Sequence, residues 1–359
     1  MTAILDLPST GQEAWRWADV AGIEHAATSP RVVPAGSLPA LDLGGARLVF
    51  VDGVLAPDLS TPRRVRVDAV DVSSDHPLGR RATGTGWTLH LDAREAETGI
   101  EIVHVSTGAE NHVPARIVLG EDAVASVVET YVGTGWANRL TGVELARSAR
   151  LSRAVRVLHD AGFVSTRDEV VVGQGASYVA TMLGAGGMGT RFDAAITMAG
   201  DAGYAEMGGA LLTREDQRQE CVVRVRHAAP NGQSHQTWRA VAADTSTASL
   251  AAAVEVARDA QKTDGEQSLR GLLLKRTATV NLKPELEIFA DDVKCAHGAT
   301  VGELDARALF YLESRGIAPP RAKALLTRAF VADALGRIGD EGVREAFVAD
   351  ADAWLERAL

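Results

Sequence analysis

Short segments rich in β-branched residues follow one another from Gly99 to Thr300. Each is about four to six residues long and is bounded by Gly, Asp or Asn. Few helix-length amphipathic patterns lie between them, so the pattern predicts an all-β body. The clearest segments are residues 101–105, 115–119, 126–131, 155–158, 169–172, 221–225 and 286–289.

Two kinds of architecture could join these strands. A spacing of roughly 20 residues per supersecondary turn fits a β-solenoid, in which successive coils stack edge to edge. A sandwich or a barrel of short strands fits the same pattern equally well. The hydrophobic pattern alone leaves this choice open.

The hydrophobic period changes towards the C-terminus, where a first helix is predicted. Leu304, Ala308, Tyr311 and Leu312 fall at helical spacing. Gly316 follows them and is a suitable residue to end the helix.

Two more helices are predicted after this one. Pro319 and Pro320 open the second, which ends near Gly336, and Asp340 can cap the third. Their apolar stripes are Ala322, Leu325, Leu326, Ala329 and Phe330, and then Val343, Phe347, Ala351, Trp354 and Leu355. A bundle of three such helices is too small to bury every apolar face internally.

The N-terminal part of the chain mixes short elements with connectors. Residues 13–16 give a helical signal that we expect to pack Trp15 and Trp17 against the body, and residues 47–54 predict a strand that closes on a turn. We divide the chain into an N-terminal helical or mixed segment, a β core and a C-terminal helical domain. Their expected bounds are residues 1–98, 99–302 and 303–359.

The stretch 281–302 holds the side chains best suited to metal chemistry. Residues 286–290 alternate as a strand, residues 291–292 mark a turn, and another strand follows. In an extended strand, residues i and i+2 face the same side about 7 Å apart. Cys295 and His297 therefore present a thiol and an imidazole side by side, and both are ligands for transition metals and iron–sulfur clusters.

The spacing of this pair has a simpler explanation as well. A cysteine near a histidine is more often a small buried side chain beside a hydrogen-bonded ring than a ligand pair. Both interpretations stay open on spacing alone.

Several uncommon short sequence motifs follow one another in the C-terminal half of the chain. They are residues 261–263 (QKT), Gln267, residues 272–274 (LLL), 283–288 (KPELEI) and 295–300 (CAHGAT). Together they resemble the SufB/SufD family of iron–sulfur cluster assembly proteins, and its SufD members more than its SufB members. The resemblance is dense from Ser234 to Phe330, looser from Pro114 to His227, and patchy before that.

This resemblance implies a right-handed parallel β-helix core and a non-enzymatic scaffold subunit. It implies a SufB-like scaffold as the partner in a heterodimer and a SufC-like ABC ATPase that docks on the C-terminal helices. The isolated chain could also form a homodimer. Residues 57–99 are polar and rich in Arg and Gly, and there the sequence departs from the family's expected helical segment.

The resemblance also implies which residues act. His297 is the preferred ligand for iron or a transient iron–sulfur cluster shared with the SufB-like partner, and Cys295 lies beside it. The residues expected to bind the partner are Leu304, Phe310, Tyr311, Leu325 and Phe330. Two cysteines cannot supply the four thiolates that a [4Fe–4S] cluster takes, so we expect no cofactor to be held stably by the isolated chain.

Composition narrows the cellular setting. The 359 residues are 46% apolar, enough for a large core, and carry 37 Lys plus Arg against 47 Asp plus Glu, a net charge of -10. No basic stripe points to nucleic acid. We expect a cytoplasmic protein without a membrane partner, since there is no signal-peptide pattern, no apolar run of about 20 residues, and no disulfide framework.

Other motifs receive structural interpretations. Residues 184–189 (GAGGMG) match G-x-G-x-x-G, but no helix pattern follows, so we expect a tight turn. No Gly-Lys pair exists, so ATP would be hydrolysed by another subunit. We expect His227, Ser234 and His235 to hold a coil corner through hydrogen bonds, and Cys221 to lie in the core.

Two other functions compete with the assembly role. One is a β-helix enzyme acting on polysaccharide, which needs a carboxylate cluster along a solenoid groove. The absence of a secretion signal counts against it. The other is a structural homodimer with a vestigial site.

Overall fold

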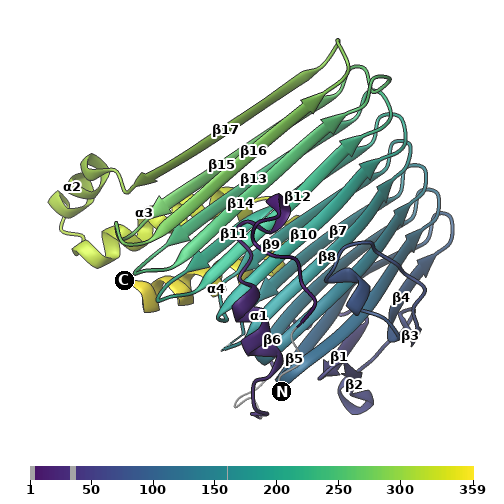
Figure 1. Ribbon diagram of the computed structural model, residues 1–359, viewed down its shortest axis with the longest axis horizontal. Coiled ribbons are helices and arrows are strands. Elements are labelled where there is room, and N and C mark those ends of the chain that lie inside the picture. Colours follow the sequence, from purple (N-terminus) through teal and green to yellow (C-terminus); the bar gives the residue numbers. More distant parts are fainter. Residues whose placement is uncertain (1–4, 33–37, 160) are drawn as a thin grey trace.

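The computed structural model describes residues 5–32, 38–159 and 161–359, and these form a long parallel β-solenoid (Figure 1). Each coil contributes one strand to each of two walls. The even wall consists of β8 (Phe163–Val172), β10 (Gly189–Met198), β12 (Arg218–His227), β14 (Thr247–Val256) and β16 (Thr279–Ile288). The odd wall consists of β7 (Arg150–Val157), β9 (Ser177–Gly184), β11 (Tyr204–Thr213), β13 (Gln233–Ala242), β15 (Asp264–Leu273) and β17 (Lys294–Glu303). The predicted mainly-β solenoid is confirmed.

The coils are larger than the sequence suggested. Arg218 lies 29 positions after its partner Gly189, and Thr247 lies 29 positions after its partner Arg218. The expected spacing of roughly 20 residues was wrong, because each coil carries two strands and two turns. Strands such as β12 are ten residues long rather than about half that, since polar residues interrupt their apolar pattern without ending the strand.

Two longer strands begin the solenoid. They are β5 (Ala96–Leu119) and β6 (Val124–Leu145), which pair in parallel along most of their length. The first part of β6 pairs with β7 and the second part with β8, so β6 contributes to both walls. Four short strands precede them: β1 (Arg47–Val51), β2 (Val54–Leu55), β3 (Arg66–Ala69) and β4 (Thr85–Leu91). The predicted strand and turn at residues 47–54 are confirmed.

Alternate residues of each strand point into the interior of the solenoid, which we call the lumen. Their side chains stack on those of the neighbouring coils and fill it. In β12, Cys221 and Val223 are buried and face inward, whereas Arg224 faces outward and is exposed. In-register pairing places Cys221 between Phe192 and Leu250 of the neighbouring coils, and all three belong to the main hydrophobic core. Cys221 is therefore a core residue, as predicted, and burial raises the pKa of its thiol.

A network of charged side chains interrupts this apolar lumen. Arg153, fully buried, donates through Nε to Glu129 at 2.7 Å and pairs through Nη1 with Asp168. Tyr131 donates its hydroxyl to Glu129 at 2.8 Å. Burial alone would raise the pKa of Glu129, but Arg153 and His104 outweigh it and hold that pKa well below its usual range.

The N-terminal segment packs against the outer face of the even wall. It contains a 3-10 helix, η1 (Glu13–Trp15), and α1 (Val20–Ala27). Trp15 is buried, with the Arg191 guanidinium 4.5 Å from its ring centre, and Trp17 is half-buried. Short 3-10 turns at η2 (Pro57–Leu59) and η3 (Gly79–Arg81) lie further along the chain. The expected packing of the two tryptophans is confirmed.

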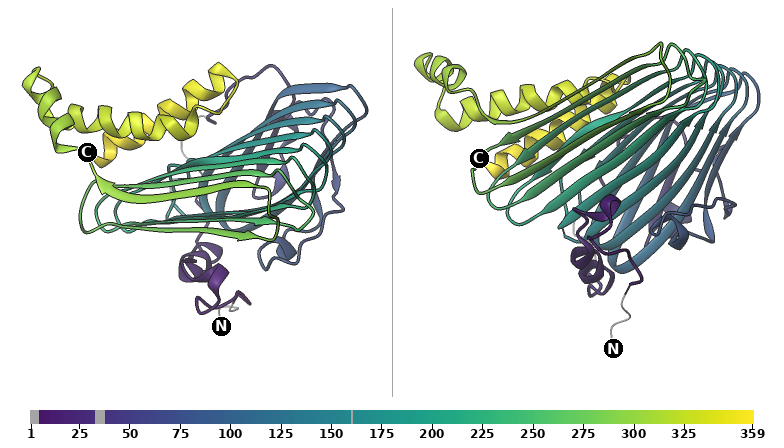
Figure 2. Two further views of the ribbon diagram at one scale, coloured as in Figure 1. Left: turned by 90° about the horizontal axis from the view of Figure 1, so that it is seen from above. Right: turned by 45° about the horizontal axis from the view of Figure 1, so that its top comes forward.

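The C-terminal helices lie on the opposite side of the solenoid, along the odd wall (Figure 2). They are α2 (Ala306–Ser314), α3 (Pro319–Leu335) and α4 (Glu341–Ala358), and all three were predicted. Asp340 caps α4 by accepting from Val343 N at 2.9 Å, and all five residues of the predicted α4 stripe are buried. In α3 the buried face differs: Ala322, Val331 and Leu335 are buried, whereas Ala329 is exposed.

Ion pairs fasten the helices to the odd wall. Arg156 of β7 pairs with Asp350 of α4 at 2.9 Å, and Arg239 of β13 pairs with Asp333 of α3. No helix in the described ranges is long and apolar enough to cross a membrane.

Replacing Arg153 with Met should lower the free energy of unfolding by about 3–5 kcal/mol, because two buried carboxylates lose their shared cation. Chemical denaturation followed by circular dichroism would measure this change. Arg150→Met, on the exposed face of the same strand, is the control and should leave stability unchanged. Equal stability of the two variants would contradict a structural role for the ion network.

Candidate functional site

The solenoid ends in an uncovered coil formed by β16 and β17 (Figure 1). Among the described residues, β17 pairs with β15 only and β16 with β14 only. Lys294 N donates to Thr263 O of the preceding coil, so even-numbered residues of β17 bond to the solenoid. The backbone N–H and C=O groups of the odd-numbered residues 295–303 therefore point to a free edge.

The free edge of β16 differs from that of β17. Thr279 N donates to Ser246 O, so odd-numbered residues of β16 bond to β14. Pro284 is even-numbered, and its nitrogen, which has no hydrogen, faces the free edge. Proline therefore leaves the ladder to β14 intact and removes one donor from the exposed edge of β16. The free edge of β17 has no such gap.

Cys295 and His297 lie on this last strand, on the face that continues the lumen. Cys295 is half-buried and packs against the main core, and a methyl group placed on Gly265 beneath it would lie 3.4 Å from its sulfur. His297 is exposed and stacks in register on Gln267. The predicted strand, turn and shared face of this stretch are confirmed.

The surroundings of Cys295 favour the protonated form of its thiol. Burial raises its pKa, Asp264 raises it further, and a hydrogen bond with the backbone of Gly265 lowers it. A metal that binds the sulfur must therefore displace a proton.

The pair cannot complete a metal site by itself. No group of three or more His, Cys, Asp or Glu side chains in the described part of the chain is arranged to hold a metal ion. A tetrahedral iron site needs four ligands, so two would have to come from sulfide or from another chain.

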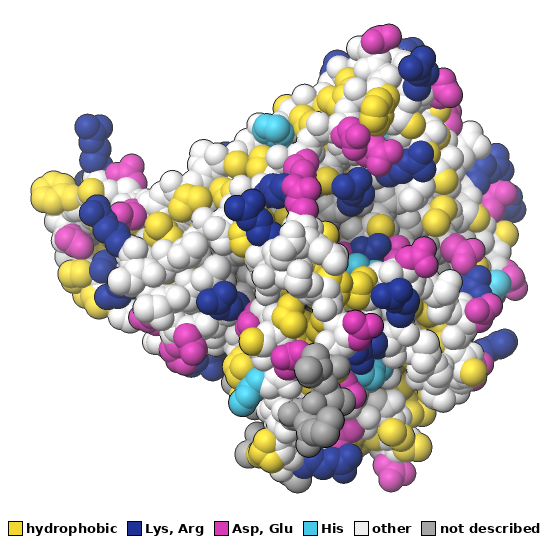
Figure 3. All heavy atoms as spheres, viewed as in Figure 1, with side chains coloured by type: hydrophobic (Ala, Val, Ile, Leu, Met, Phe, Trp, Pro, Cys, Tyr) yellow, Lys and Arg dark blue, Asp and Glu magenta, His cyan; other side chains and the backbone are white. Residues whose placement is uncertain are grey.

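The residues predicted to bind a partner lie in two settings. Phe310 and Tyr311 are 73% and 57% exposed on α2, which projects from the body (Figures 2 and 3). Leu304 and Phe330 are partly buried against the core between the helices and the odd wall. Leu325 lines a groove of about 290 Å³ between α3 and α4. Of the five predicted residues, Phe310 and Tyr311 alone form a protruding apolar surface.

The remaining motifs have the structural roles expected of them, except for His235. Residues 184–189 span the end of β9, a turn and the start of β10, with no helix following. His227 bonds to Ser234 at 2.8 Å across the corner between β12 and β13. His235 lies instead on the outer face, 3.6 Å from Glu266. Asp291 and Asp292 occupy the bend between β16 and β17.

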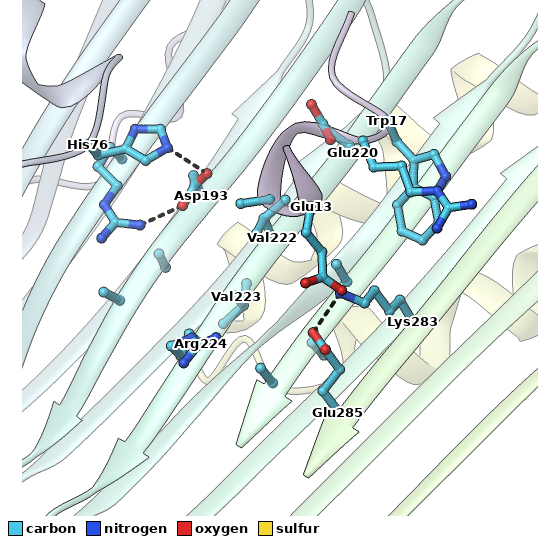
Figure 4. A pocket seen from close by; sticks show the side chains of 18 residues that line it. Glu13, Trp17, His76, Asp193, Glu220, Val222, Val223, Arg224, Lys283 and Glu285 are labelled. Carbon is cyan, nitrogen blue, oxygen red and sulfur yellow. Dashed lines mark hydrogen bonds and ion pairs between the residues drawn. The ribbon is translucent and has the colours of Figure 1, made fainter. Parts of the chain in front are cut away.

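A second hollow lies between the N-terminal segment and the even wall (Figure 4). It has a volume of about 350 Å³, and both apolar and charged side chains line it. Lys283 bonds to Glu13 at 2.7 Å and lies 3.0 Å from Glu285, and His76 pairs with Asp193 at 3.1 Å. The Lys283–Glu13 pair joins the N-terminal segment to β16, and the His76–Asp193 pair joins the loop before η3 to β10. Each carboxylate named here has a basic side chain within 3.1 Å.

The sequence interpretation missed two groups in the lumen. They are the ion network around Arg153 and the buried amides of Gln236 and Gln267. All are polar residues at inward-facing positions, which a test for apolar segments treats as interruptions. The coil register, once known, would have placed them on the lumen face.

A model of the family described as "SUF system FeS cluster assembly, SufBD core domain" matches residues 102–330, more than half of the chain. The chain belongs to this family. The resemblance noted from the sequence is thereby confirmed, and the family's members are components of iron–sulfur cluster assembly.

Curated relatives agree with this assignment. The iron–sulfur cluster assembly protein SufD of Escherichia coli is 27% identical over 375 residues, which covers 96% of this chain and 88% of that protein. A SufBD family protein of Synechocystis is 25% identical and covers 93% of this chain and 84% of its own length. SufD of Bacillus subtilis is 28% identical over 42% of this chain and 34% of its own.

Proposed function

We propose that this SufBD family protein is a SufD-like, non-enzymatic subunit of a SufBCD-type assembly complex. The observation that carries the proposal is the uncovered last coil, which presents Cys295 and His297 beside an unpaired strand edge. A partner strand added to that edge would bring its own side chains next to these two. Iron or a nascent cluster, as cargo, would then be held between the subunits.

The exposed surfaces support two separate contacts. The free edge of β17 offers a row of unpaired backbone donors and acceptors to a SufB-like solenoid. The α2 aromatics offer an apolar surface to a SufC-like ABC ATPase, through helix-in-groove packing. Because α3 and α4 are joined to the odd wall by ion pairs, movement of a bound ATPase would be passed to the solenoid.

The competing functions receive less support. A polysaccharide-active enzyme would need a groove of free carboxylates, whereas the carboxylates that line the hollow of Figure 4 are engaged in ion pairs. A structural homodimer with a vestigial site remains as the outcome in which loss of His297 has no effect on cluster assembly.

The role of His297 can be tested in the complex. Co-expression with the cognate SufB-like and ATPase subunits, followed by anaerobic purification, should yield a complex in which His297→Ala lowers iron and sulfide content on the order of ten-fold. The reason is that a ligand has been removed. Thr300→Ala, on the outward face of the same strand, is the control and should leave cluster content unchanged. Unchanged content in His297→Ala would contradict the residue assignment, and failure to co-purify would contradict the assembly role.

The strand edge can be tested separately with Val301→Pro. Val301 is odd-numbered in β17, so proline removes a donor from the free edge while the bonds to β15 remain. We expect co-purification of the SufB-like subunit to be lost while circular dichroism and melting temperature stay near those of Val301→Ala. Normal co-purification of Val301→Pro would show that the partner does not add a strand at β17.

The ATPase contact can be tested with Phe310→Asp. A charge in the centre of an apolar contact should weaken ATPase binding by roughly 2 kcal/mol, about 30-fold in Kd. Phe289→Asp is a matched control, because Phe289 is also an exposed aromatic but lies at the opposite end of the last coil. Isothermal titration with the purified ATPase would measure both. Equal affinities would show that α2 is not the docking element.

A further inference from the structure

A column of buried amides ends at His297. In-register pairing stacks Gln236 on β13, Gln267 on β15 and His297 on β17. Both glutamines are 1% exposed, although amides are rarely buried without reason. Both glutamines face the lumen. On β15, Gly265 and Leu269 lie two positions before and after Gln267, and they are also buried and face the lumen. His297 therefore follows directly above a buried amide on the same face.

The orientation of each amide is determined by the opposite wall. Gln267 Nε2 donates to the backbone oxygen of Glu285 at 3.3 Å, and Gln236 Nε2 donates to that of Ala253 at 3.2 Å. A flipped amide would place two oxygens against each other, so the nitrogen must face the even wall. The two Oε1 atoms then point elsewhere, and both are buried without a hydrogen-bond partner among the described residues.

A buried amide oxygen that accepts no hydrogen bond is rare in native proteins, so a donor is expected close to it. Each Nε2 carries two hydrogens, and only one is used in the bond to the even wall. In this structure the second hydrogen of Gln267 is not bonded to Oε1 of Gln236, one coil below, so both oxygens lack a donor. In the coil above, the residue stacked on Gln267 is His297, whose ring carries an N–H donor.

We propose that Gln267 is a positioning residue for His297. In this structure the two side chains are not hydrogen-bonded; once the exposed His297 ring turns towards the amide, Oε1 accepts a hydrogen bond from one ring nitrogen. A neutral imidazole has one N–H and one lone pair, so fixing the donor nitrogen also fixes which nitrogen can bind a metal. The part of this inference that concerns iron rests on the proposed function, whereas the part that concerns the ring tautomer does not.

Ring nitrogen NMR of the metal-free chain tests the tautomer directly. The native chain and the Gln267→Met variant would both be labelled with ¹⁵N-histidine and compared. Methionine keeps a similar volume and lacks the acceptor oxygen. A His297→Gln variant would identify the signals of His297. We expect the two ring nitrogens of His297 to be widely separated in the native chain, as in a single tautomer. The separation should shrink towards that of a free histidine in Gln267→Met. Gln236→Met removes the same amide one coil below and should leave the His297 shifts as in the native chain.

Two results would overturn the proposal. One is averaged ring shifts for His297 in the native chain, which needs no variant. The other is an unchanged separation in Gln267→Met. If Gln267→Met does not fold, Gln267→Asn withdraws the oxygen by one methylene while keeping an amide, and it should give the same shrinkage.

A second measurement separates this inference from the proposed function. In the purified complex, Gln267→Met should lower iron content about ten-fold, as loss of a group that orients a metal ligand does. A changed tautomer with unchanged iron content would show that Gln267 positions the ring but that His297 does not bind iron. An unchanged tautomer, together with iron loss in His297→Ala, would overturn the inference and leave the proposed function standing.

Discussion

In-register parallel pairing between coils is the constraint on which the rest of this structure depends. Each residue of one coil lies above its counterpart 29 to 32 positions earlier along most of the even wall. Side chains therefore stack in columns, and the lumen is filled by columns rather than by independent contacts. A slip of one residue would move a whole inward set to the outside, so the burial of each strand also specifies its register.

Two of the polar levels in the described part of the lumen differ in kind. The first is the network of Glu129, Arg153 and Asp168 near the N-terminal coils, where one guanidinium is shared by two buried carboxyl groups. The second is the amide column near the C-terminal coils. Phe192 and Trp238, whose ring centres are 6.5 Å apart, belong to the apolar core that surrounds these levels. Buried polar groups of this kind fix the register at a cost in stability, because an alternative register would leave them unpaired.

Local signals explain what could be predicted from the sequence. The cap and the buried stripe of helix α4 were predicted correctly, because an Asp cap and a period of 3.6 are both local features. The shared face of Cys295 and His297 followed from strand alternation in the same way. The choice between a solenoid and a sandwich could not be made from pattern, since pairing partners lie about 30 positions apart and only the family resemblance decided it. The inward placement of Arg153 and Gln267 depends on that same distant register, which is why both were missed.

The uncovered last coil has a thermodynamic consequence. In a stack held by nearest-neighbour contacts, an interior coil is stabilised from both sides and a terminal coil from one side only. The strand that carries Cys295 and His297 is therefore among the first parts of the solenoid to open, and its amides should be among the least protected from solvent exchange. Covering that coil with another chain would convert it into an interior coil. Local order at the candidate ligands and association with a partner are then two aspects of a single equilibrium.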